Sequence, residues 1–141
     1  MDDRSKSWRI FAPKKRMNKK LNYEYCHAAP VLEWMGQKWA LVTLLRMKEA
    51  DDEAAQAGGI RFSDLYRTIP QISEKMLAST LDYLEQEGLV NRVVQATFPP
   101  HVTYSLTPLA LNFLREISYV IEWGQLHYEE ILQGRKTPHT R

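Results

Sequence analysis

A proline between two short amphipathic segments limits what this chain can fold into more than any other feature. Pro70 is expected to end a helix, because its ring removes a backbone donor and restricts the residue before it. In the segment ahead of it, Leu65 and Ile69 are four residues apart, and Ser63 is the expected N-cap. Ser73 is the expected cap of a second helix with one apolar face: Leu77, Leu81 and Leu84. The sequence therefore predicts two short helices joined by a tight turn.

Two strand patterns follow this helix pair. Gly88 is expected to end the helix in a left-handed conformation, residues 89–95 are strand-like, and Pro99 and Pro100 are expected to form a rigid loop tip. A second strand alternates its apolar residues: Val102, Tyr104 and Leu106. Thr107 is then expected to cap a long helix that has Pro108 at its first position. Two helices and a projecting hairpin are the parts of a winged helix, so the predicted fold is mainly α with a small β-hairpin wing.

The region ahead of the helix pair is less regular. Apolar residues recur at helical spacing over residues 29–48, and Gly36 interrupts them, which indicates two short helices or one bent helix. Residues 49–59 are expected to be an acidic connector, and residues 60–62 a short strand. One compact domain over residues 23–134 is predicted, with a basic arm at 1–22 and a flexible tail at 135–141.

The net charge of +2 is divided unevenly along the chain. Residues 1–20 hold eight basic and two acidic side chains, while the other 121 residues carry 11 basic and 15 acidic ones. The arm is therefore basic and the folded part mildly acidic. The basic segment of residues 1–20 fits three interpretations. The arm could be solvated, it could bind nucleic acid or membrane headgroups, or it could be ordered by a partner surface.

The second helix of the pair has polar side chains opposite its leucines, which fits either a solvated surface or a helix inserted in a major groove. We predict that its first half approaches the bases through Lys75, Met76, Ser79 and Thr80. Helix ends at Ser63 and Ser73 are expected near phosphates, and Arg92 and His101 are assigned to the wing. The predicted reading elements are thus the 73–87 helix and the 95–103 wing.

These motifs resemble the HxlR-type branch of winged-helix bacterial regulators, which are related to the MarR-type proteins. The likeness lies in Cys26 twelve residues ahead of Lys38–Trp39, in residues 61–90, and in residues 98–110. The likeness covers roughly residues 26–123, and the acidic connector at residues 49–59 is longer than that of the family. The chain departs from the family pattern after the cysteine, just before Lys38–Trp39, and at positions that would face DNA. These residues are His27, Gln37, Ser79, Thr80, Asp82 and His101.

The resemblance implies a homodimer, formed by the first helix and the long C-terminal helix, that binds double-stranded DNA as a transcriptional regulator. A single cysteine fits a reducing, intracellular setting, so a cytoplasmic location is expected. The apolar stripe of the last helix agrees with it, and the interface candidates are Leu109, Phe113, Ile117, Val120, Ile121 and Trp123. Aromatic residues such as Trp34, Tyr119 and Tyr128 fit either this interface or an intramolecular core. The rival interpretation is a winged-helix protein-interaction module with weak or no specific DNA binding.

The single cysteine fits two interpretations. A lone thiol is most often a small buried hydrophobic group. In the family that the chain resembles, the cysteine matching Cys26 can instead sense oxidants or electrophiles, so a small-molecule or oxidant effector is a candidate partner. No catalytic or metal-ligand constellation and no cofactor motif stands out, so no enzyme activity is expected. No apolar run is long enough for a membrane span.

Overall fold

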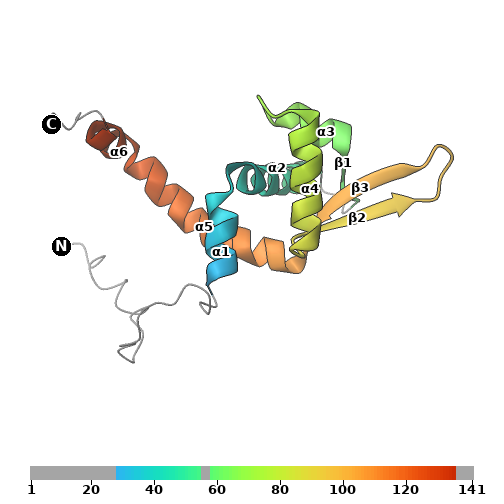
Figure 1. Ribbon diagram of the computed structural model, residues 1–141, viewed down its shortest axis with the longest axis horizontal. Coiled ribbons are helices and arrows are strands. Elements are labelled where there is room, and N and C mark those ends of the chain that lie inside the picture. Colours follow the sequence, from blue (N-terminus) through green and yellow to red (C-terminus); the bar gives the residue numbers. More distant parts are fainter. Residues whose placement is uncertain (1–27, 55–57, 136–141) are drawn as a thin grey trace. The chain divides into compact units, whose positions relative to one another are not determined.

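The computed structural model describes residues 28–54 and 58–135. The chain divides into two compact units, Met1–Glu33 and Trp34–Arg141, and the second holds every element from the end of the first helix onward. Its helices and its three-stranded sheet can be followed in Figure 1. Cys26, the predicted arm and nearly all of the predicted tail lie outside the described residues.

The region of residues 29–54 forms two helices, α1 (Ala29–Gly36) and α2 (Lys38–Ala54), so the break expected at Gly36 is confirmed. The prediction of an acidic connector from residue 49 is wrong, because α2 continues to Ala54. Two ion pairs on the helix surface accompany this extension: Arg46 pairs with Glu49 at 2.8 Å, and Lys48 pairs with Asp52. Such pairs at i,i+3 and i,i+4 support helix formation, so an acidic run need not be a loop.

The helix pair around Pro70 consists of α3 (Phe62–Thr68) and α4 (Glu74–Gln86). Ser73 caps α4 as predicted, and its side chain accepts a hydrogen bond from the Met76 backbone N–H at 3.1 Å. Ser63 does not cap α3, because the helix begins one residue earlier and the N-cap position is Arg61, which makes no side-chain cap bond. In the turn between the helices Gln71 has φ 68°, a conformation that L side chains rarely adopt.

The sheet joins a short strand to the hairpin in the order β1–β3–β2, all antiparallel. Its strands are β1 (Ile60–Arg61), β2 (Val90–Gln95) and β3 (His101–Leu106), so Phe62 belongs to α3 and not to the strand expected at 60–62. Gly59 has φ 75°, and a Cβ there would lie 2.8 Å from the carbonyl oxygen of Tyr104. This close approach requires glycine where the chain enters β1. Gly88 likewise has φ 73°, which agrees with the stop expected after α4.

The predicted long C-terminal helix is divided into α5 (Pro108–Leu126) and α6 (Tyr128–Arg135). Thr107 caps α5, accepting from the Ala110 N–H at 3.2 Å, and its hydroxyl donates to the Gly88 carbonyl at 2.8 Å. The core lies between α2, α3, α4, the sheet and the first half of α5. Its buried apolar members are Trp34, Ala40, Leu44, Met47, Leu65, Ile69, Ile72, Leu77, Leu81, Leu84, Leu89, Val90, Leu106, Ala110, Leu114 and Ile117.

Candidate nucleic-acid interface

The α4 helix separates a buried leucine face from a polar face. Leu77, Leu81 and Leu84 are almost completely buried. The exposed face carries the polar residues expected there from the sequence: Lys75, Ser79, Asp82 and Gln86. This division follows from the helical repeat, since residues three and four apart share a face. The leucines fix how α4 rotates on the core and hence which side chains a partner would meet.

Thr80 lies on the wrong side of α4 for a base contact. The sequence placed it on the groove face with Ser79, but its side chain is 7% exposed and its hydroxyl donates to the Met76 carbonyl at 2.7 Å. The reason is its position one residue before Leu81 and three residues after Leu77, which turns it toward the core. This part of the prediction is corrected.

The other candidates in the first half of α4 lie together on its exposed surface. Lys75 is exposed, and Met76 keeps 43% of its surface accessible. Ser79 donates to the Met76 carbonyl at 3.0 Å, an intrahelical bond that still allows its hydroxyl oxygen to accept from a partner. Ser73, just ahead of them, uses its side-chain oxygen as the helix cap. Ser63 is exposed on α3.

The two wing candidates face opposite ways. Arg92 pairs with Tyr104 across the hairpin, whereas His101 pairs with Gln95. Side chains alternate along a strand, so Arg92 and Tyr104 share one face of the hairpin, while His101 and Gln95 share the other. The wing therefore does not bring Arg92 and His101 to one point.

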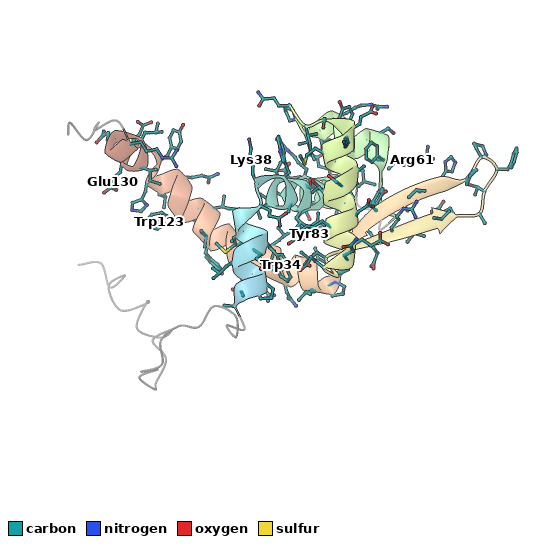
Figure 2. All side chains as sticks on the ribbon, viewed as in Figure 1. Trp34, Lys38, Arg61, Tyr83, Trp123 and Glu130 are labelled. Carbon is teal, nitrogen blue, oxygen red and sulfur yellow. The ribbon has the colours of Figure 1, made fainter. Side chains whose placement is uncertain are left out.

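Three exposed residues of the helix pair and the wing were not predicted as site residues from the sequence. Arg61 ends β1 and precedes α3 (Figure 2), and Arg67 in the last turn of α3 is paired with Asp64 at 3.4 Å. Phe98 at the wing tip is fully exposed, with a relative accessibility of 103%. Two sequence signals could have indicated these residues. Arg61 and Arg67 are basic residues at the ends of the first helix of the pair, and Phe98 is an aromatic residue beside two prolines.

The charge of α4 itself is not favourable to nucleic acid. Lys75 is its one basic residue, against Glu74, Asp82 and Glu85. Arg61 and Arg67 add positive charge from neighbouring elements, and Arg92 adds it from the wing. Attraction for phosphate must therefore come mainly from residues outside α4.

A second surface, on the C-terminal helices, is apolar and exposed. Trp123 is 54% exposed (Figure 2), and α6 has no buried residue. The other large exposed apolar side chains of these helices are Leu109, Leu111, Tyr119, Val120, Leu126 and Tyr128. Leu111 and Leu126 were not selected from the sequence, because they lie off the stripe that it suggested.

The predicted interface residues divide into three groups in this structure. Leu109, Val120 and Trp123 are exposed, and Phe113 and Ile121 are half-buried against the core. Ile117 is 5% exposed within its own chain, which corrects its placement on a free surface. Trp34 is also buried in the core, where its ring packs edge-on against that of Phe113 with the ring centroids 5.4 Å apart.

A pocket of about 550 Å³ opens between α2 and α5. Its lining combines leucines with two basic residues and a hydroxyl: Leu45, Lys48, Leu111, Leu114, Arg115 and Ser118. Pockets of this size and mixed lining can accept a small organic molecule. Among residues 28–54 and 58–135, no three His, Cys, Asp or Glu side chains are placed to hold a metal ion. Within the same ranges, no helix is both long and apolar enough to cross a membrane.

Comparison with known proteins gives consistent matches. The family model of the HxlR-like helix-turn-helix matches residues 34–132. The HTH-type transcriptional regulator YtfH of Escherichia coli (strain K12) is 38% identical over 112 residues, which is 79% of this chain and 82% of that protein.

Two solved structures are similar over most of their length. The transcriptional regulator YtfH of Salmonella typhimurium has a TM-score of 0.64 at 36% identity, covering 84% of this chain and 98% of that one. The redox regulator HypR in its oxidised form has a TM-score of 0.58 at 31% identity, covering 71% and 95%.

Proposed function

The chain belongs to the HxlR-like helix-turn-helix family of transcriptional regulators, and from this premise we propose that it binds operator DNA as a homodimer, with α4 in the major groove and the 95–103 wing on the flanking DNA. The division into a 1–22 arm, a 23–134 domain and a 135–141 tail is part of the proposal. A cytoplasmic location is part of the same proposal.

The observation that carries the proposal is the presentation of α4. Its leucine face is buried in the core, and Ser73 caps its N-terminus. The exposed side chains of its first half include Lys75, Met76 and Ser79. In helix-turn-helix proteins the N-terminal residues of the second helix contact base edges, and the first helix crosses the backbone. Arg61 and Arg67 would then lie on the side of the first helix, where phosphates are the expected contacts.

Homodimer formation is supported by the apolar C-terminal helices. Trp123, Leu126 and Tyr119 together expose large apolar surface on α5, which ends at Leu126 and is followed by α6. Contiguous exposed apolar patches of this kind mark interaction sites. A twofold dimer would place two α4 helices about one DNA turn apart, so the operator is expected to be palindromic.

Two effector routes are proposed for this regulator. Cys26 would respond to oxidants or electrophiles, and the relevant support is the likeness to HypR, which is a redox regulator. The pocket between α2 and α5 would accept a small, mainly apolar organic molecule, because its lining is rich in leucine. The basic groups of Lys48 and Arg115 in this lining are each paired with a carboxylate, Asp52 and Glu116 respectively. Both routes rest on the DNA-binding function.

Selection of bound duplexes from a random pool by the full chain tests the function directly. We expect enrichment of a palindromic sequence, and we expect the affinity for it to fall steeply as salt rises, because neutralised phosphates release counterions. Binding that is weak, unselective and insensitive to salt would favour the protein-interaction module instead. Repeating the selection with and without an oxidant tests the effector route through Cys26.

A further inference from the structure

The wing ends in a fully exposed aromatic ring. Phe98 lies in the loop between β2 and β3, with a relative accessibility of 103%. Within residues 28–54 and 58–135, its ring meets no other aromatic ring and it belongs to no hydrophobic cluster. A phenylalanine in this position does not support the fold, so its apolar surface is available to a partner.

The loop that carries Phe98 is short and conformationally restricted. Pro99 and Pro100 fix two backbone φ angles, and the Thr97 hydroxyl donates to the Pro99 carbonyl at 3.0 Å. The two strands behind it are paired without interruption from Val90↔Leu106 to Gln95↔His101. This hairpin projects away from α4, and the tip is its farthest point (Figure 1). The ring is therefore held on a stiff support, which lowers the entropy lost on binding.

The tip carries no charge. Residues 96–100 are Ala, Thr, Phe, Pro and Pro, the first residue after them is His101, and Arg92 is the nearest lysine or arginine of the hairpin. Residues 96–100 themselves carry no charged side chain with which to hold a phosphate. The tip presents instead an apolar side chain next to prolines, which is the composition of the wedges that some proteins insert between base steps from the minor groove.

Resting on the DNA-binding function proposed above, we propose that Phe98 is such a wedge: its ring enters the minor groove beside each major-groove contact and partly unstacks one base step. The step is pyrimidine–purine, because TA and CA/TG steps unstack most readily. Phe98 thereby contributes sequence preference without a hydrogen bond to any base. The occupant of this surface is duplex DNA and not a protein groove.

The proposal is tested with a duplex selected by the full-length chain and carrying 2-aminopurine at one flanking position at a time. Unstacking raises the fluorescence of this base. We expect the wild-type chain to raise it at one step on each side of the operator, and Phe98→Ala to abolish that rise and weaken binding about tenfold. Phe98→Leu should keep part of both effects, because leucine is also used as a wedge.

The matched control is Val94→Ala, which shortens another exposed apolar side chain of the same hairpin and should leave the fluorescence unchanged. Thermal unfolding of each variant checks that the wing is intact, and a surface change at the tip should leave Tm nearly constant. Tight operator binding without a fluorescence rise at any flanking base would overturn the wedge alone. Absence of duplex binding by the wild-type chain would overturn the wedge together with the proposed function.

Discussion

The indole Nε1 of Trp34 donates a hydrogen bond to Oε2 of Glu87 at 2.8 Å, which joins the end of α1 to the residue after α4. Trp34 is 8% exposed and also meets Phe113 of α5 edge-on, with an interplanar angle of 78°. One side chain therefore contacts both the end of the predicted recognition helix and the helix that leads to the apolar C-terminal surface. Its loss should affect the fold more than any surface change.

We expect Trp34→Phe to lower the free energy of unfolding by about 1–3 kcal/mol, since it removes one hydrogen bond to a carboxylate and part of a buried ring. Trp34→Ala should cost about 3–5 kcal/mol, because it also leaves a cavity. Urea unfolding followed by circular dichroism measures both values. Glu87→Gln keeps an acceptor and should cost less than Trp34→Phe; an equal loss would mean that the charge of Glu87, and not the contact, matters.

The two serines that were predicted as helix caps give an internal comparison. Ser73 accepts from the Met76 N–H, whereas Ser63 makes no cap bond. Ser73→Ala should lower the free energy of unfolding by about 1 kcal/mol, and Ser73→Asp should preserve stability, because aspartate caps equally well and favours a helix N-terminus. Ser63→Ala should stay within about 0.5 kcal/mol of wild type. Similar losses at both positions would contradict the assignment of the caps.

These serines also show which parts of the fold can be predicted from the sequence. The turn at Pro70, the cap at Ser73 and the leucine face of α4 were predictable, because each depends on neighbours within a few residues. The start of α3 was not, because pairing of β1 with β3 across more than forty residues fixes where the chain leaves the sheet. The acidic end of α2 is a different case, because its ion pairs join residues three and four apart, a spacing that is visible in the sequence although composition alone indicates a connector.

The candidate site was predictable only where helical periodicity determines which side chains are exposed. Periodicity placed Lys75 and Ser79 on the exposed face of α4, but Thr80 lies at the boundary between the two faces and is buried. The opposite facing of Arg92 and His101 depends on strand register, which the sequence did not specify. Phe98 has no periodic signal, since it lies in a loop.

Lys75 is the basic residue of the proposed groove helix. Lys75→Ala should weaken operator binding about three- to tenfold, and a phosphate contact would in addition flatten the slope of log K against log[salt] by about one unit. Fluorescence anisotropy at several salt concentrations measures both. The control is Arg46→Ala on α2, which removes one positive charge from a residue paired with Glu49, outside the proposed DNA surface. Equal effects of the two substitutions would show that only net charge matters and would remove Lys75 from the site.

The exposed apolar surface of α5 and α6 should hold the dimer together. Trp123→Glu places a charge in the middle of this surface and is expected to shift the chain from dimer to monomer, because a buried unpaired carboxylate is costly at an interface. Sedimentation equilibrium at several protein concentrations measures the shift. Val93→Glu, an equivalent change on the wing, should leave the dimer intact. If Trp123→Glu remains fully dimeric, the dimer must use another surface.

Cys26 allows the redox route to be separated from DNA binding itself. If its thiol is the sensor, diamide should change the operator affinity of the wild-type chain and leave that of Cys26→Ser unchanged, because this is the single cysteine of the sequence. With one thiol per chain, oxidation by diamide can join two subunits or add an external thiol, and mass spectrometry distinguishes these products. Both chains should bind the operator equally before treatment. Complete modification of Cys26 without any change in affinity would leave the thiol as an ordinary apolar side chain and direct the search for an effector to the pocket between α2 and α5.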